Sequence, residues 1–245
     1  MARPTRHELK EDKFKTTFEA YEQFVKEHYR EILTVVGFAL GIIALVVGLK
    51  LLLDRQEAAA NAQLGEALDT FHAYVGAPAP GAVGPQAESF PTAQEKYAKA
   101  LAQFSVMVNV KGYPRLLPEP KAVRIARYHV GLCEAALGDD VEAIKSLTEV
   151  ARDRDPDIAS LAKYSLADEL AKTGKLADAV KLYQGLMDHP TSTVPKATAQ
   201  LALADAYRAT QPAQARQIYE RMAKEFAAEP EVADAVKQQI ESLQK

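Results

Sequence analysis

The longest apolar stretch of the chain runs from Ile32 to Leu53. Its part from Ile32 to Leu49 contains no charged residue, and Lys50 is the only charge before Asp54. About 20 mainly apolar residues, at about 1.5 Å rise per residue, match the hydrocarbon core of a bilayer, where only a helix satisfies the backbone. The pattern therefore predicts one transmembrane helix over residues 32–53.

Two other structures for this stretch are disfavoured. A buried core helix rarely lacks a polar face over this length. A cleaved signal peptide has a shorter apolar core of about 7–15 residues, and here Asp54, Arg55 and Glu57 follow the stretch directly. We therefore expect an uncleaved signal anchor, preceded by a charged amphipathic arm over residues 1–31.

The distribution of basic residues predicts the orientation of this anchor. The arm holds seven Lys and Arg residues, whereas Lys50 and Arg55 are the only basic residues on the other side before Lys96. Because cytoplasmic flanks carry the excess of Lys and Arg, we expect the arm in the cytoplasm. Residues 54–245 would then lie in the periplasm, held at the bacterial inner membrane by a single pass.

After the anchor, one helical pattern of small and large residues recurs with a constant offset of 36 residues. In each copy an alanine is followed four positions later by a large residue, and three positions after that by an apolar residue, all on one helix face. The copies are Ala143-Leu147-Val150, Ala179-Tyr183-Leu186 and Ala215-Tyr219-Met222, with a further copy upstream at Ala100-Phe104-Met107. The alanine marks the place where two helices approach closely.

Each of these helices follows another predicted helix, so the repeating unit is a helix pair. Such a pair cannot bury its apolar face alone, so successive pairs must stack. The pattern resembles the tetratricopeptide repeat, with a small residue on the first helix, a glycine at the turn and an alanine early on the second helix. The residues that carry this resemblance are Gly131, Gly138, Ala143, Ala167, Gly174, Ala179 and Ala215. The last copy departs from it, with Thr210 at the glycine position.

The sequence thus predicts an all-α protein in which the anchor precedes a short α-solenoid of divergent tetratricopeptide-like helix pairs over residues 54–245. Helical spacing of apolar residues predicts a capping helix over 231–244. Proline and glycine over 76–91 predict a flexible insertion in the first pair. Since no Gly or Pro occurs between Gly48 and Gly65, the anchor helix is expected to continue into the first helix of the domain.

Composition and motifs exclude several function classes. Residues 54–245 carry 22 Lys and Arg against 26 Asp and Glu, a mildly acidic balance that argues against nucleic acid as a partner. The single cysteine, Cys133, cannot form an internal disulfide. The five histidines are scattered, and the sequence has no phosphate-binding loop, nucleophile elbow or CxxC motif. We expect no enzymatic activity, no cofactor and no metal.

Two surfaces are candidates for contacts with other proteins. Small residues on one face of the anchor would allow close packing with another membrane helix, in a homo-oligomer or with a partner; they are Gly37, Gly41, Ala44 and Gly48. Glycine is also common in membrane helices in general. In stacked helix pairs the first helices line a groove, and its expected residues are Tyr128, Leu132, Tyr164, Asp168, Gln200 and Tyr207. Ordinary core or solvated positions are the alternative for each of these.

The order of elements resembles the ancillary subunit family of the bacterial Sec translocon, single-span inner-membrane proteins with periplasmic repeats. The stretch 21–29, which leads into 35–41, is similar to the junction of that family. The resemblance implies an interaction module beside the translocon, with Sec subunits, periplasmic chaperones and exported polypeptides as partners. The alternative is a periplasmic scaffold for envelope assembly or cell division, whose members usually have a cleaved signal or a lipidated cysteine.

Overall fold

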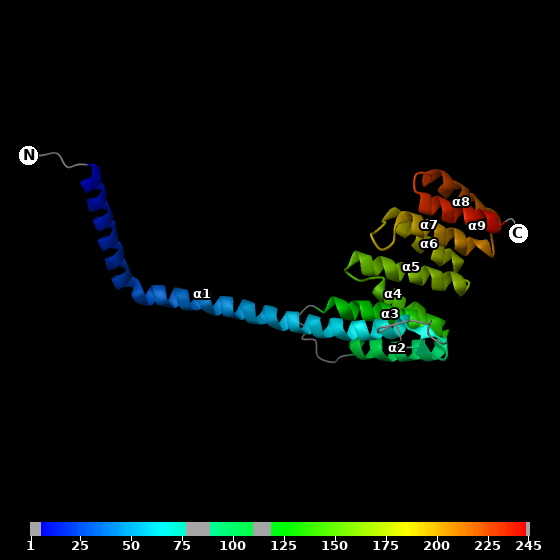
Figure 1. Ribbon diagram of the computed structural model, residues 1–245, viewed down its shortest axis with the longest axis horizontal. Coiled ribbons are helices and arrows are strands. Elements are labelled where there is room, and N and C mark those ends of the chain that lie inside the picture. The colour runs from blue at the N-terminus through cyan, green and yellow to red at the C-terminus, as the bar shows by residue number, and fades with distance from the viewer. Residues whose placement is uncertain (1–5, 77–88, 110–118, 244–245) are drawn as a thin grey trace, which may run out of the picture. The chain divides into compact units, whose positions relative to one another are not determined.

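The structure is a computed structural model that describes residues 6–76, 89–109 and 119–243 (Figure 1). The side chains of residues 6–21, 23 and 24 also lie outside the described part. The described chain is helical apart from two strands of two residues each. It divides into two compact units, Met1–Gln56 and Glu57–Lys245, each of which is described by itself.

The first unit consists of the N-terminal part of one long helix, α1 (Arg6–His72). Within it lies a segment that is long and apolar enough to span a membrane, as the sequence led us to expect. That residues 32–53 form an uncleaved membrane anchor stays a prediction. The large apolar side chains of the segment are exposed; the Phe38 side chain, for example, is 75% exposed. Lipid would solvate such a surface, whereas water would not. The helix continues through Gly65, as expected from the lack of Gly and Pro before it.

The second unit begins within α1 and contains the remaining elements. They are α2 (Ala93–Val108), α3 (Lys121–Leu137), α4 (Asp140–Val150), α5 (Pro156–Lys172), α6 (Leu176–Asp188), α7 (Lys196–Arg208), α8 (Pro212–Glu225) and α9 (Pro230–Ser242), with strands β1 (Tyr74–Val75) and β2 (Ser89–Phe90). The helix expected over 231–244 corresponds to α9. Of the predicted insertion at 76–91, residues 77–88 lie outside the described part.

Among the residues that the structure describes, the two strands are the one departure from the expected all-helical secondary structure. They pair in parallel, with Tyr74 opposite Ser89 and Val75 opposite Phe90. A strand of two residues is too short to show an alternating pattern, so the sequence contained no signal for it.

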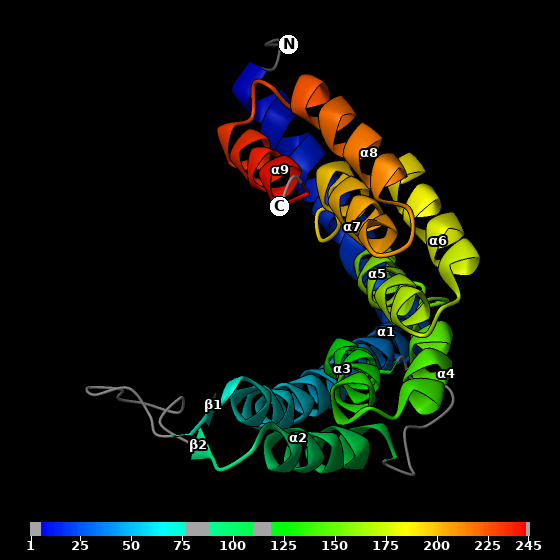
Figure 2. The same ribbon diagram turned by 90° about the vertical axis from the view of Figure 1, so that its right-hand side faces the viewer.

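From α2 onward each helix packs mainly against the helix before it and the helix after it, and α3, α5 and α7 also contact one another in series. In Figure 2, α3, α5, α7 and α9 follow the inner side of a curve, and α4, α6 and α8 follow its outer side. The repeated small and large residues supply the contacts between helices. None of the twelve is more than 3% exposed: Ala100, Phe104, Met107, Ala143, Leu147, Val150, Ala179, Tyr183, Leu186, Ala215, Tyr219 and Met222.

Three glycines of the predicted repeat signature have identifiable structural roles. A Cβ atom placed on Gly131 of α3 would lie 2.8 Å from Cγ and Cδ2 of Leu147 in α4, so only glycine allows this helix approach. Gly138 and Gly174 end α3 and α5 with φ of 85° and 82°, the left-handed conformation that favours glycine. The equivalent of Gly131 in α5 is Ala167, which is fully buried.

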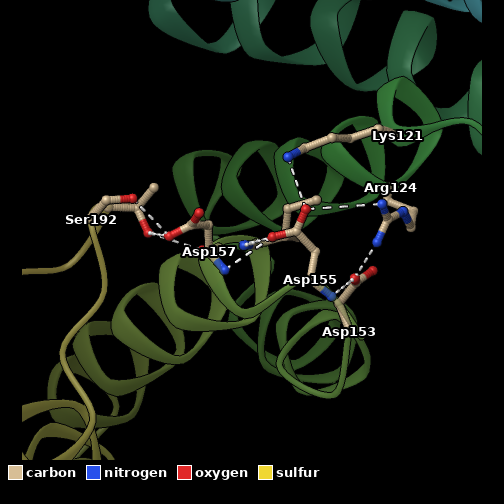
Figure 3. A network of polar contacts seen from close by, with 8 residues as sticks. Lys121, Arg124, Asp153, Asp155, Asp157 and Ser192 are labelled. Carbon is tan, nitrogen blue, oxygen red and sulfur yellow. Dashed lines mark hydrogen bonds and ion pairs between the residues drawn. The ribbon is translucent and has the colours of Figure 1, made fainter.

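Carboxylates fix the turn between α4 and α5 (Figure 3). Asp153 accepts a hydrogen bond from Arg124 Nη1 at 2.6 Å and another from the backbone N–H of Asp155 at 2.8 Å. Asp155 caps the N-terminus of α5 and pairs with Lys121 Nζ at 2.8 Å, which lowers the pKa of its carboxyl. Asp157 accepts from Ser192 Oγ at 3.0 Å, which ties the first turn of α5 to the loop before α7.

Candidate protein-binding surface

The candidate surface is made by the side chains that α3, α5 and α7 leave exposed or half-buried, and it is called the inner face below. Tyr128 of α3 and Ser165 of α5 bond through their hydroxyls at 3.0 Å. The Tyr164 ring meets the Tyr183 ring edge-to-face, with centroids 6.2 Å apart. Tyr128, Tyr164 and Tyr207 all pack against one buried cluster that includes Tyr183. The inner face is therefore rich in aromatic surface held by the core below it.

Two aspartates on the inner face accept hydrogen bonds from buried tyrosines of the second helices. Asp168 Oδ1 accepts from Tyr183 Oη, and Asp205 Oδ1 accepts from Tyr219 Oη. Both tyrosines are at most 1% exposed and need a partner for the hydroxyl, whereas both aspartates remain exposed. Each aspartate thus accepts a hydrogen bond from a core tyrosine with Oδ1, and its exposed carboxylate can accept further hydrogen bonds at the surface.

In the preceding helix pair, the positions equivalent to Asp168 and Tyr183 are held by leucines. Leu132 lies 36 residues before Asp168 and is half-buried, and Leu147 lies 36 residues before Tyr183 and is fully buried. The inner face therefore changes along its length. At this position it carries a leucine on α3 and an aspartate on α5 and on α7.

The electrostatics of the inner face favour neutral tyrosines beside carboxylates. Partial desolvation raises the pKa of Asp168, the hydrogen bond from Tyr183 lowers it, and the nearby charge of Asp205 raises it again. Burial, together with Asp168 and Asp205, raises the pKa of Tyr164 to about 12. At neutral pH this surface presents acceptor oxygens flanked by aromatic rings.

Only one of the two aspartates has a cation beside it. Arg208 Nη1 lies 3.6 Å from Asp205 Oδ1, and the same side chain donates to Gln239 of α9 at 2.7 Å. Asp168 has no ion pair with any other residue that the structure describes. Among those residues there is also no group of three or more His, Cys, Asp or Glu that could hold a metal ion.

The structure brings most of the predicted groove residues together, but Gln200 lies apart from them. Its side chain is only 7% exposed, and its Nε2 donates to Glu225 Oε2 of α8 at 3.1 Å. Gln200 lies 36 residues after Tyr164, which is the offset between the second helices of the pairs. In α7 the matching positions are one residue further on, so that Leu201 is the equivalent of Tyr164 and Asp205 that of Asp168.

The shift has a local cause in the turn between α7 and α8. After α5, the N–H of Lys175 reaches back five residues to the carbonyl of Leu170, around the left-handed Gly174. After α7, the N–H of Gln211 reaches back only four residues, to the carbonyl of Tyr207. The turn that lacks glycine is therefore one residue shorter. Asp205 is an inner-face residue that the sequence prediction missed. The sequence could have indicated it, because Asp205 precedes Tyr219 as Asp168 precedes Tyr183.

The small residues of the anchor have no contact within the described chain that explains them. A Cβ atom on Gly37, Gly41 or Gly48 would have nothing within 4 Å of it. The role predicted for this face, which includes Ala44, stays a prediction. It requires a neighbour from outside this chain.

No family model matches the chain, and comparisons with curated proteins and with solved structures find no similar protein.

Proposed function

We propose that this protein is a membrane-anchored protein–protein interaction module. In this proposal residues 32–53 anchor a short α-solenoid of tetratricopeptide-like helix pairs, and the inner face binds extended segments of other proteins. The observation that carries the proposal is the series of first helices, α3, α5 and α7, which contact one another and each carry a half-buried tyrosine, with an exposed aspartate on α5 and on α7. Exposed acceptors beside aromatic rings suit the backbone N–H groups and cationic side chains of an extended chain.

We place the domain on the periplasmic side of a bacterial inner membrane, beside the Sec translocon. The excess of Lys and Arg before the anchor supports the orientation. The order of arm, anchor and helix pairs supports the translocon as the neighbour. In this role the inner face would contact periplasmic chaperones and newly exported chains, which are extended as they emerge. The anchor would contact a membrane subunit, or a second copy, through Gly37 and Gly41.

Site-specific photo-crosslinking in native membranes tests the partner. A photoreactive residue replaces Leu132, which is half-buried on α3, and in a matched control it replaces Val141 on α4, which is 78% exposed. We expect Sec subunits, chaperones or exported chains to be captured from position 132 and not from position 141. Capture of division or wall-synthesis proteins from position 132 would instead support the periplasmic scaffold. Equal capture from both positions would contradict a role for the inner face.

Protease accessibility tests the orientation. In spheroplasts of cells that produce the full chain, external protease should digest the helical domain while the inner membrane is intact. Digestion only after lysis of that membrane would place the domain in the cytoplasm and remove the translocon proposal. Resistance of the full chain to extraction with alkaline carbonate checks the anchor independently.

A further inference from the structure

A cavity of about 750 Å³ is lined by none of the tyrosines and aspartates of the inner face described above. Its walls come from the turn between α4 and α5, the first half of α5, the second half of α6 and the loop that follows α6. The floor is apolar and includes Ala159, Leu182 and Leu186. The charged side chains around it are mostly basic: Arg152, Arg154, Lys163 and Lys181, with one acid, Asp153. His189, Ser160 and Thr191 also line it.

The positive charge of this cavity is not balanced within the described chain. Asp153, its one acidic residue, is committed to Arg124 at 2.6 Å, outside the lining (Figure 3). Lys181 pairs with Asp178 at 2.9 Å, with both side chains largely exposed. Arg152, Arg154 and Lys163 form no ion pair with any residue that the structure describes.

Comparison with the next helix pair shows why Lys163 lacks an acid. In α7 and α8, Glu225 accepts from Gln200 Nε2 at 3.1 Å and from Lys196 Nζ at 2.5 Å. Gln200 is the equivalent of Lys163 at the offset of 37 residues. The equivalent of Glu225, 36 residues earlier, is His189. Where the pair α7–α8 has the carboxylate of Glu225, the pair α5–α6 has the imidazole of His189, so no carboxylate at this position neutralises Lys163.

Gly185 in α6 also lines this cavity, and no residue that the structure describes requires a glycine there. A Cβ atom on Gly185 would have no heavy atom within 4 Å, and its φ is not positive. Glycine in a helix interior weakens the helix relative to alanine. The equivalent positions in α4 and α8 hold the long side chains Glu149 and Arg221. A side chain at position 185 would project into the cavity. Glycine therefore leaves the cavity open, although it makes α6 less stable than alanine would.

We propose that this cavity binds a phosphate-bearing ligand, a role that does not depend on the proposed function of the inner face. A phosphate monoester carries close to two negative charges and three acceptor oxygens, which match several cations better than a single carboxylate does. Arginine presents paired donors that fit phosphate oxygens. The volume falls within the range of about 300–1,000 Å³ that is usual for small-molecule sites. The apolar floor suits the remainder of the ligand, from a soluble phosphorylated molecule or from a lipid headgroup.

Calorimetric titration of the full chain in phosphatidylcholine nanodiscs, with inorganic pyrophosphate as the probe, tests the site. We expect saturable binding, and about tenfold weaker binding for Lys163→Gln, since one charge-assisted hydrogen bond is lost. Gly185→Leu should weaken binding at least as much although it changes no charge. It should also keep or raise the melting temperature, which separates loss of the cavity from loss of the fold. Lys237→Gln on α9 makes the same charge change away from the cavity and should leave binding unchanged.

Nanodiscs that also contain phosphatidylglycerol identify the source of the phosphate. Weaker pyrophosphate binding in these discs shows that the lipid headgroup competes for the cavity, and unchanged binding points to a soluble ligand. Any one of three results overturns the proposal. The first is that pyrophosphate shows no saturable binding, and the second is that Lys163→Gln and Gly185→Leu both leave its binding intact. The third is that a hexaglutamate peptide binds more tightly than pyrophosphate, which would make an acidic protein segment the occupant.

Discussion

Glycine lies on a helix face in both compact units of this protein, but in opposite surroundings. In the helical domain, Gly131 faces Leu147 so closely that any Cβ atom would collide with it. In the anchor, Gly37, Gly41 and Gly48 face open space. The same kind of residue is thus a packing requirement in one unit. In the other it is a smooth surface that only lipid or another helix can cover.

The strongest test of this comparison is to add one methyl group to the domain. Gly131→Ala should destabilise it by about 1–3 kcal/mol, because Leu147 or the backbone of α4 must move. Urea denaturation of the full chain in detergent, followed by circular dichroism, measures the change. Gly185→Ala is the matched control and should stabilise the domain by up to about 1 kcal/mol, since its methyl group meets no neighbour. Equal effects of the two substitutions would show that the contact between α3 and α4 is not tight.

The anchor should respond in the opposite way to a much larger change. Replacing Gly37 and Gly41 together with leucine should leave urea denaturation of the domain unchanged, because a Cβ atom on either residue has no heavy atom within 4 Å. Association of the anchor with a second copy or a membrane partner should weaken by about 1–2 kcal/mol. Energy transfer between labelled chains in liposomes, and co-purification of partners in mild detergent, measure this loss. Association that is unaffected in both assays would leave these glycines without a role in contacts.

The two units also differ in how much of each could be predicted from the sequence. The anchor needs only length and apolar composition, which the stretch from Ile32 to Leu53 shows directly. The buried faces of α4, α6 and α8 followed from a constant offset of 36 residues. The same offset did not predict the inner-face positions on α7. The turn after α7 has no glycine and is one residue shorter than the turn after α5, so Asp205 lies where the offset predicts Ala204. One residue is enough to turn a helical position by about 100°.

The cavity lined by Lys163 could not be predicted for a different reason. Its positive charge depends on which Lys and Arg side chains have no acidic partner. This pairing is set by how the helices pack and not by any sequence motif. His189 and Gly185 show no pattern when the sequence is read alone. They become informative only when α6 is aligned with α8 and the partners of Glu225 are known.

A smaller effect is expected from the tyrosines that connect the core of the domain to the inner face. Tyr183→Phe removes the hydroxyl that donates to Asp168 and should cost about 1 kcal/mol. Tyr164→Phe is the control, since the Tyr164 hydroxyl makes no hydrogen bond within the described chain, and it should change stability by less than about 0.5 kcal/mol. Both are measured by urea denaturation. A comparable loss for both variants would mean that the bond to Asp168 contributes nothing specific.

The smallest effect on stability is expected from the ionisation of Cys133, which lies two residues after Gly131. Its thiol indicates whether water reaches the buried face of α3. The residue is fully buried, and desolvation raises the pKa of its thiol to about 12. The folded thiol therefore keeps its proton while the unfolded thiol loses it near pH 9. Stability should fall as pH rises through this range, by no more than about 1 kcal/mol at pH 9.5. Denaturation midpoints of the wild type and of Cys133→Ala, compared between pH 7.5 and 9.5, isolate this contribution. Maleimide should label Cys133 only after unfolding, and labelling of the folded chain at the same rate would show that water reaches the helix beside Gly131.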